Sequence, residues 1–299
     1  MFGGEVAMLA ASLAHHRDHV AAAAGAAVAS SGCYAVAAVL QEREASRSAV
    51  GGLAMLRVLI RRTAWWGAVL ATGAGGGLHI LALAVGPLSV VQPISMLTLV
   101  WALPLGCALT RRVVPASEWA AAALVVAGLG VTLSVLAHRG STVRLPLGAL
   151  LGTSAVCAAL VGVLVAVATR LPGRGGPILG AVAAAICSGY AATMWRAAFQ
   201  AAAPFALATL IGVVAAGAGL ALAQLAYHRG GLGAPLATLT LVNPLVAVGL
   251  GVALLGEPVV LTPLTATLCL VGISATGGGI WVLARPRTPP AADNPTHLW

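Results

Sequence analysis

Long apolar stretches alternate with short polar breaks along almost the whole chain, and nine such stretches can be marked. Each holds about 20 or more residues, which as an α-helix would cross the roughly 30 Å of hydrocarbon in a bilayer. The pattern therefore predicts an all-α, polytopic membrane helix bundle of about nine spans. The predicted spans are His19–Leu40, Thr63–Val85, Leu88–Leu109, Glu118–Ala137, Pro146–Ala168, Gly176–Ala197, Ala203–Tyr227, Leu232–Leu255 and Val259–Ala284.

The breaks between the apolar stretches divide the chain into four parts. Residues 1–18 form a mixed N-terminal extension, residues 19–137 hold the first four spans, and residues 146–284 hold the other five. The Pro-rich residues 285–299 are expected to be a disordered tail. Inside the first long break, Val50–Ile60 is apolar enough to predict a short helix at the membrane interface.

Composition supports the membrane assignment, because 60% of the 299 residues are hydrophobic and 8% are charged, against about a quarter charged in soluble domains. The formal net charge of +9 comes from 16 Arg and no Lys. These arginines lie in the breaks, so they indicate membrane orientation, and nucleic-acid binding is not expected. Twelve lie on one side: Arg43, Arg47, Arg57, Arg61, Arg62, Arg111, Arg112, Arg170, Arg174, Arg229, Arg285 and Arg287. The other side has Arg17, Arg139, Arg144 and Arg196. The positive-inside rule then predicts a plasma-membrane protein with its N-terminus outside and its C-terminus in the cytoplasm.

Two stretches in the two halves of the chain share an ordered set of features. Ala84–Gly106 and Arg229–Gly251 each begin at a Gly-bearing turn, hold an early proline, and continue through Thr-Leu-Val and a second proline to Leu-Gly. Their starts are 145 residues apart, and they pair the third predicted span with the eighth. Helices five spans apart cross the membrane in opposite directions, so the pattern predicts an inverted internal repeat, which is a transporter construction.

Further short motifs lie on and around these stretches. The second half has Gly-Leu-Gly-Ala-Pro at 231–235, Asn243-Pro244 and Leu-Gly-Glu at 255–257. The first half has Leu-Ser-Val-Val-Gln-Pro at 88–93, Ser-Glu-Trp at 117–119, Val-Ala-Gly at 126–128 and Val-Leu-Gln-Glu-Arg at 39–43. From about Val20 to Ala284 the chain thus resembles the drug/metabolite transporter superfamily, in its EamA-like, actinobacterial-type branch. The resemblance implies a membrane carrier, with export as the expected direction.

The chain departs from that family in two respects. The common family pattern has ten spans with both termini inside, whereas nine can be counted here, as in the magnesium-transporter-like branch. The first repeat also has Arg111-Arg112 where the family motif has Gly-Glu. If the first repeat lacks one helix, the N-terminus lies outside, which agrees with the arginine count; a tenth, unrecognised span remains open.

The residues needed for catalysis or metal binding are missing from the predicted spans, so no enzyme activity, cofactor or metal site is expected. The acidic residues are all terminal or near span edges: Glu5, Asp18, Glu42, Glu44, Glu118, Glu257 and Asp293. A magnesium-type cation carrier remains an alternative only through such edge carboxylates. His79 is the one titratable candidate for proton coupling inside a span. The glycine run at 73–77 predicts a close helix contact through the spacing Gly73-xxx-Gly77.

Polar side chains at mid-membrane depth are the best candidates for a substrate site. Asn243 precedes Pro244, which removes a helix hydrogen bond near the middle of the eighth span, and carriers of this construction bind substrate at broken helices. Trp101 and Thr98 lie at the matching level of the third span. The further candidates are Ser95, Gln92, Thr240 and Tyr190. The alternative role for such groups is interhelical hydrogen bonding, at roughly 0.6 kcal/mol per bond.

These candidates predict a secondary transporter that works by alternating access. Aromatic and amide side chains with few charges suit a small amphipathic metabolite, drug or lipid-linked compound better than a compact ion. The expected partners are membrane lipids and the small-molecule substrate, with a homodimer left open. A non-transporting lipid-binding or assembly protein is the alternative from another class, and a polar-lined central cavity would favour the transporter.

Overall fold

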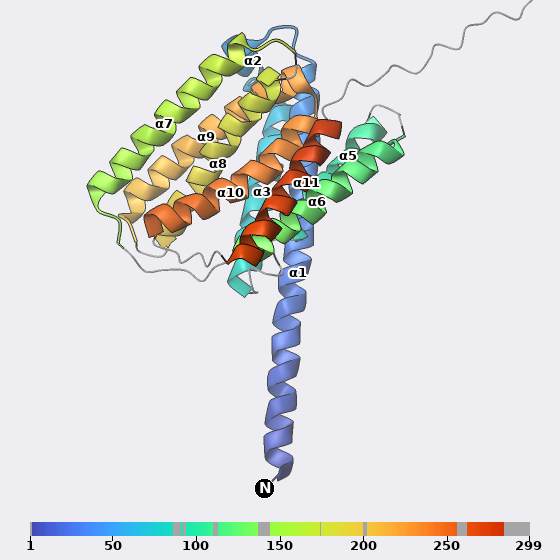
Figure 1. Cartoon of the computed structure of the whole chain (residues 1–299), viewed down its shortest axis with the longest axis vertical. Helices are drawn as coiled ribbons and strands as arrows, with labels where there is room; N and C mark the ends of the chain where they lie inside the picture. Colours follow the sequence, from blue (N-terminus) through green and yellow to red (C-terminus); the bar gives the residue numbers. More distant parts are fainter. Residues whose placement is uncertain are drawn as a thin grey trace, which may run out of the picture.

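The computed structural model describes residues 2–85, 91, 94–109, 113–136, 144–173, 175–199, 202–255 and 262–283. Within these ranges the chain forms ten α-helices and no β-strand (Figure 1). The helices are α1 (Phe2–Ser46), α2 (Gly52–Leu59), α3 (Thr63–Val85), α5 (Leu97–Leu109), α6 (Ala116–Leu136), α7 (Leu147–Arg170), α8 (Gly175–Phe199), α9 (Phe205–Gly230), α10 (Gly233–Leu255) and α11 (Pro263–Leu283). The tail at 285–299, expected to be disordered, lies outside the described residues.

Seven of the described helices are long and apolar enough to cross a membrane: α1 from His19 onward, and α6 to α11. The predicted polytopic helical membrane bundle is therefore confirmed. The other two predicted spans overlap α3 and α5, which are not among the seven. Helix α3 has 23 residues, and the described part of α5 has 13 residues, which rise only about 20 Å.

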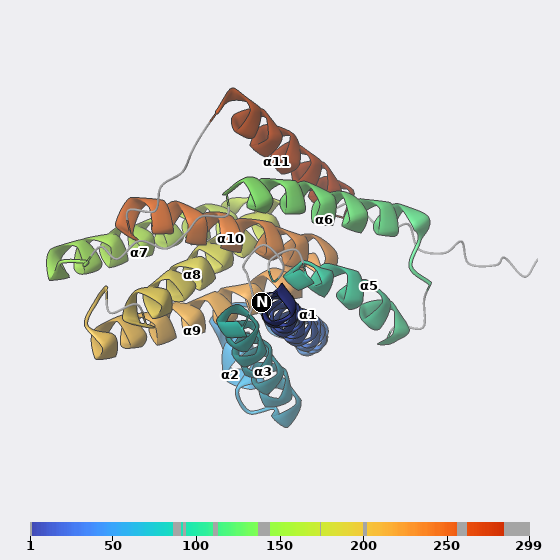
Figure 2. The same ribbon diagram turned by 90° about the horizontal axis from the view of Figure 1, so that it is seen from below.

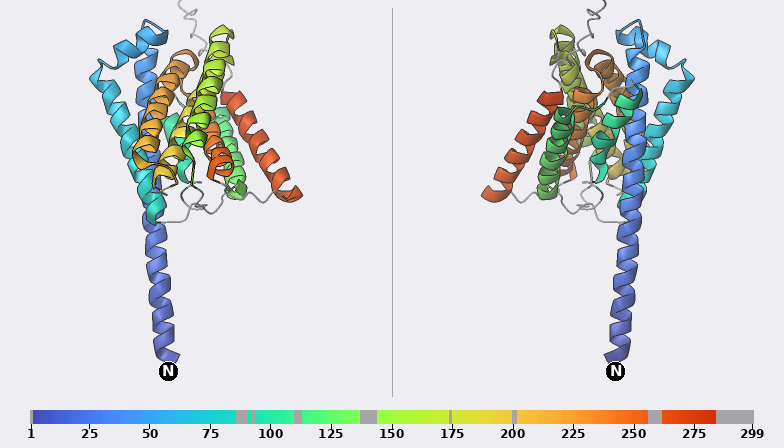
Figure 3. Two further views of the ribbon diagram at one scale, coloured as in Figure 1. Left: turned by 90° about the vertical axis from the view of Figure 1, so that its left-hand side faces the viewer. Right: turned by 90° about the vertical axis from the view of Figure 1, so that its right-hand side faces the viewer.

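The first helix is longer than the apolar pattern predicts. α1 is continuous for 45 residues, so residues 2–18 belong to the same helix as the first span, and the helix continues beyond Leu40 to Ser46. Figures 1 and 3 show its first turns projecting away from the other helices. Glu44 stabilises the last turns, because Arg62 at the start of α3 donates to its carboxylate at 3.2 Å. The chain then reverses through Gly52, whose φ is +64°, a value that favours glycine.

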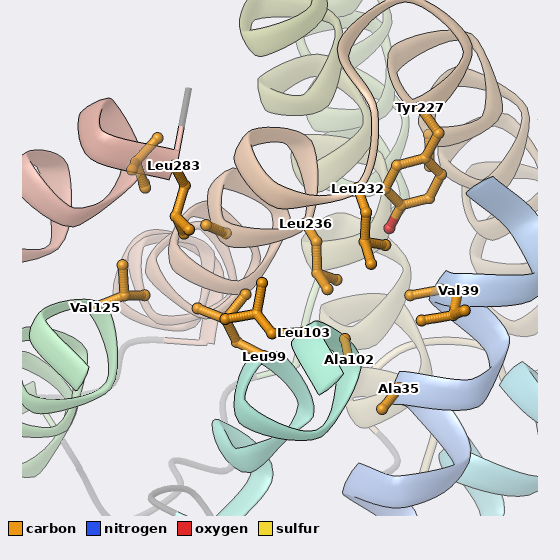
Figure 4. Packing of buried hydrophobic residues seen from close by; sticks show 14 of the residues in the cluster. Ala35, Val39, Leu99, Ala102, Leu103, Val125, Tyr227, Leu232, Leu236 and Leu283 are labelled. Atoms are coloured by element: carbon orange, nitrogen blue, oxygen red, sulfur yellow. The ribbon is translucent and has the colours of Figure 1, made fainter. Parts of the chain in front are cut away.

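The helices form two groups around a shared centre. In one group α1 packs against α3 and α5, and in the other α8 packs against α7, α9 and α10 (Figure 2). α1 also contacts α9 across the centre, and α6 pairs with α11. One end of the bundle, called here the α2 end, holds α2, the ends of α1 and α9 and the starts of α3 and α8. At the opposite end α8 finishes at Phe199 and α9 begins at Phe205. The central buried cluster joins side chains of the two groups, including Val39, Leu103 and Leu236 (Figure 4).

Helices α6 and α11 cross closely at two glycines. A Cβ atom added at Gly128 would lie 2.6 Å from Thr276 Oγ1, and one added at Gly272 would collide with Thr132 Oγ1. Each threonine hydroxyl donates back to the glycine one turn earlier on its own helix, Thr132 to Gly128 O at 2.9 Å and Thr276 to Gly272 O at 2.8 Å. Only glycine permits this approach, so small residues set the contact, as is common between membrane helices.

The glycine contact predicted from the spacing Gly73-xxx-Gly77 is wrong. No atom lies within 4 Å of a Cβ built at Gly73 or Gly77. The glycines that do meet another helix are Gly75 and Gly76, which lie against the ring and hydroxyl of Tyr34 on α1. Spacing alone could not distinguish the two faces, and the face with Gly73 and Gly77 borders the internal cavity described below.

Candidate functional site

A cavity of about 750 Å³ lies between the two groups of helices, with lining residues from α1, α3, α5, α6, α8, α9 and α10. Each helix turns one face inward, because its lining residues recur at helical spacing. On α1 these residues are Tyr34, Ala37, Ala38 and Gln41, and on α8 they are Ser188, Ala191, Ala192 and Trp195. The described lining residues include no Asp, Glu or Arg. The cavity is thus uncharged, with isolated polar groups on mainly apolar walls.

Five of the predicted site residues line this cavity: His79, Ser95, Thr98, Thr240 and Asn243. They come from three parts of the chain. His79 is on α3, Ser95 lies just before α5, Thr98 is in the first turn of α5, and the other two are on α10. The structure therefore brings polar groups of both halves of the chain to one space.

Asn243 is the most available of these polar groups. Its side chain is half-buried and has no hydrogen-bond partner within the described part of the chain. The next residue, Pro244, lies inside α10 and also lines the cavity. Because proline has no N–H, it leaves the Thr240 carbonyl without its usual helix donor. A carboxamide and a freed carbonyl thus lie one turn apart on the lining face, and both can hydrogen-bond a ligand.

The hydroxyl groups near His79 are partly engaged by their own helix. Ser95 Oγ lies 2.9 Å from Val91 O and 3.2 Å from His79 Nδ1, while Thr98 Oγ1 donates to Ser95 O at 2.8 Å. When Ser95 gives its single proton to Val91 O, His79 Nδ1 is the donor to Ser95, and Nε2 remains the acceptor nitrogen of the neutral ring. His79 can then accept a hydrogen bond from a ligand.

Two predicted site residues that the structure describes, Trp101 and Tyr190, do not join this group. Trp101 is 43% exposed on α5 and does not line the cavity. Tyr190 is buried between α7 and α8, where its hydroxyl lies 2.7 Å from Ser154 Oγ, so it serves as an interhelical contact. Gln92 lies outside the described residues.

Several lining residues were missed because they lie near the ends of the predicted spans. The most notable are Gln41 on α1 and Tyr227 on α9, together with Phe199 and Phe205 at the opposite end of the bundle. The two phenylalanine rings pack edge to face with centroids 5.8 Å apart, and the residues are 70% and 58% exposed. The cavity therefore reaches the surface beside an aromatic pair. The signal was present on α1, where Gln41 continues the helical stripe of Tyr34, Ala37 and Ala38.

At the α2 end, polar side chains of three helices connect across the cavity. Gln41 Nε2 on α1 donates to Thr72 Oγ1 on α3 at 2.9 Å, and Gln224 Nε2 on α9 donates to Gln41 Oε1 at 3.0 Å. Gln224 is completely buried, and its Oε1 atom has no hydrogen-bond partner among the described residues. Tyr227, Leu232 and Val39, which belong to the same helices or to the start of α10, lie together in the central apolar cluster (Figure 4).

Beyond the amide bridge, further polar contacts join the same three helices. The buried Glu44 carboxylate accepts from Arg62 at 3.2 Å and lies 3.7 Å from Arg47. His228 Nδ1 on α9 lies 2.7 Å from the Ala45 carbonyl of α1. The cavity is closed at the α2 end by these successive contacts.

Comparison with known proteins gives no further constraint. Searches of protein-family models, curated proteins and solved structures found no match to this chain. Among the described residues, no group of three or more His, Cys, Asp or Glu side chains is arranged to hold a metal ion. The geometry of the cavity is therefore the basis for inferring function.

Proposed function

We propose that this protein is a secondary transporter, of the drug/metabolite transporter type, that moves a small amphipathic molecule across the plasma membrane by alternating access, with export as its direction. The observation that carries the proposal is the cavity without charged lining residues in the described part of the chain, which is bordered by both halves and exposes the amide of Asn243, unpaired among the described residues. Its volume of about 750 Å³ is within the range typical of small-molecule sites.

An inverted repeat within a nine-span bundle is part of this proposal, and the helix contacts support it. With α1, α3, α5 and α6 as counterparts of α8, α9, α10 and α11, the contact of α1 with α3 matches that of α8 with α9. The contacts of α1 with α5 and of α8 with α10 match in the same way, and α6 packs against its own counterpart. Among the described helices α7 has no counterpart, in agreement with four spans in the first repeat and five in the second.

The glycine contacts support the same pairing at the level of residues. Gly128 and Gly272 are 144 residues apart, as are Thr132 and Thr276, and each glycine meets the threonine of the other helix. Such reciprocity is expected of a two-fold axis that passes through the crossing. Gly75 and Gly219 are also 144 residues apart, and they meet Tyr34 and Ser188 respectively.

The chemistry of the cavity supports an uncharged or weakly polar substrate. A charged compound would lose its hydration without gaining an opposite charge, because the described lining residues include no Asp, Glu or Arg. The amide of Asn243 and the His79–Ser95 pair offer hydrogen bonds to a polar group, while the apolar walls accept a hydrocarbon part.

Ligand binding followed by liposome flux tests the proposal. Purified protein is screened by thermal shift against uncharged amphipathic compounds, each paired with a charged analogue, and the compounds that stabilise it are then followed as flux into proteoliposomes. We expect Ala192→Trp, which fills the cavity from an exposed lining position, to reduce binding and flux at least tenfold. The matched control is Ala158→Trp on the exposed face of α7, which should change neither.

Two results would count against transport. Equal binding and flux in the Ala192→Trp and Ala158→Trp proteins would remove the cavity from consideration as the substrate site. Binding that depends on Ala192 without any flux would favour the alternative of a lipid-binding or assembly protein.

A further inference from the structure

The two ends of the cavity differ, because in the described part of the chain polar contacts between helices close it at the α2 end alone. The difference between the ends corresponds to the presence of one helix contact and the absence of its counterpart in the other repeat. α1 packs against α9 at the α2 end, where the amide bridge lies. By the repeat pairing, the counterpart of this contact would join α8 to α3 at the opposite end. Among the described residues those two helices make no comparable contact, and the lining residues at that end, Phe199 and Phe205, are exposed.

The same pairing identifies the residues that correspond to the closed contact. The lining stripe of α8 repeats that of α1 at a separation of 154 residues, which pairs Gln41 with Trp195. The lining residues of α3 and α9 repeat at 144, as in Thr72 with Ala216 and His79 with Ala223. That separation pairs Gln224 with Ile80, which is 54% exposed in this structure.

We propose that these two residue pairs are the gates of the cavity. Gln41 and Gln224 close it at the α2 end in the state seen here, and Trp195 with Ile80 closes it at the opposite end in the other state. The inference rests on the proposed transport function and specifies how access alternates. An inverted repeat makes the two states related arrangements, because closing one contact corresponds to opening its counterpart.

The closed gate is built so that it can open. Burial of Gln224 leaves its Oε1 atom without a partner among the residues that the structure describes, and an unpaired buried acceptor destabilises the arrangement that buries it. The hydrogen bond from Gln224 to Gln41 is therefore offset in part by the acceptor left on the same side chain. A pair of leucines in these positions would have neither the hydrogen bond nor the unpaired acceptor.

The gates can be tested by measuring two distances in the same protein. The five native cysteines are replaced, and spin labels are attached in lipid nanodiscs to one of two engineered cysteine pairs. Ser46→Cys with Arg229→Cys reports on the α2 end, and Leu81→Cys with Phe199→Cys reports on the opposite end; all four positions are exposed. Without gate substitutions we expect a short distance in the first pair and a long distance in the second.

Two substitutions then give opposite expectations. Gln41→Leu leaves both amide atoms of Gln224 buried and unpaired, so the ratio of open to closed populations at the α2 end should rise about tenfold. The population with a short second distance should rise in the same proportion. Adding Gln224→Leu removes the unpaired groups and should restore the short first distance. Thr267→Val, on the exposed surface of α11, serves as the control and should change neither distance.

Each outcome decides one point. If Gln41→Leu lengthens the first distance while the second stays unchanged, the end has only loosened and coupled gates are overturned. If the double variant stays open, the amide pair is not the gate. No ligand is present in these measurements, so coupled distance changes in a protein that shows no liposome flux would overturn transport and still support the gates.

Discussion

At the scale of single residues, polar groups in this bundle divide into those that bind helices together and those left available to a ligand. Asn243 belongs to the second kind, and Tyr190, bonded to Ser154, to the first. We expect Asn243→Leu to weaken ligand binding about tenfold, as for the loss of one hydrogen bond, without lowering the unfolding temperature. Tyr190→Phe should cost about 1 kcal/mol of stability and leave affinity unchanged. Thermal unfolding and ligand titration of both variants check this, and the opposite assignment of effects would refute it.

For the candidate site, the sequence could predict how deep in the membrane each polar side chain lies. Asn243, Thr98, Thr240, Ser95 and His79 were found because a polar side chain at the middle of a span is costly unless it has a partner or a ligand. Depth does not specify which side of the helix faces inward, so Trp101 was included although it faces outward. Gln41 lies just past the predicted span His19–Leu40, so depth did not identify it, whereas α1 continues through it.

At the scale of helices, close packing depends on glycines that face another backbone, and α6 offers a matched comparison. Gly128 faces Gly272 and Thr276 of α11, while nothing lies within 4 Å of a Cβ built at Gly130. We expect Gly128→Ala to destabilise the protein by about 1–3 kcal/mol through overpacking. Gly130→Ala should be neutral or stabilise by up to about 1 kcal/mol, since alanine favours helix. Thermal unfolding in detergent distinguishes the two, and equal effects would mean that the crossing is not tightly packed.

The helices themselves were largely predictable, because the apolar runs that define them are long. Each of the nine predicted spans overlaps one helix, and the short helix expected at Val50–Ile60 is present as α2. The end of α1 was missed because it is set by a long-range contact, the Glu44–Arg62 pair, which leaves no periodic signal. Contacts between helices were harder to predict, since Gly73-xxx-Gly77 and Gly128 look alike in sequence and only the fold distinguishes them.

At the scale of the whole molecule, the asymmetry of charge should fix how the bundle lies in the membrane. The α2 end includes five arginines between Arg43 and Arg62, and the ends of α7 and α9 add Arg170 and Arg229. Among the described residues, the opposite end has Arg144 and Arg196. Since positively charged loops are retained in the cytoplasm, we expect the α2 end to be cytoplasmic and α1 to project outside.

Reporter fusions and thiol labelling test this orientation independently. A fluorescent reporter fused after residue 284 should be active, and a phosphatase that works only outside the cytoplasm should be inactive at the same point. In a cysteine-free background, Leu53→Cys on α2, which is 73% exposed, should react with an impermeant maleimide only from the cytoplasmic face of vesicles. Labelling of Leu53→Cys on intact cells, together with an active phosphatase, would show that the protein has the opposite orientation in the membrane. The gate now closed by Gln41 and Gln224 would then face outward, and the proposed direction of export would have to be reconsidered from the state seen here.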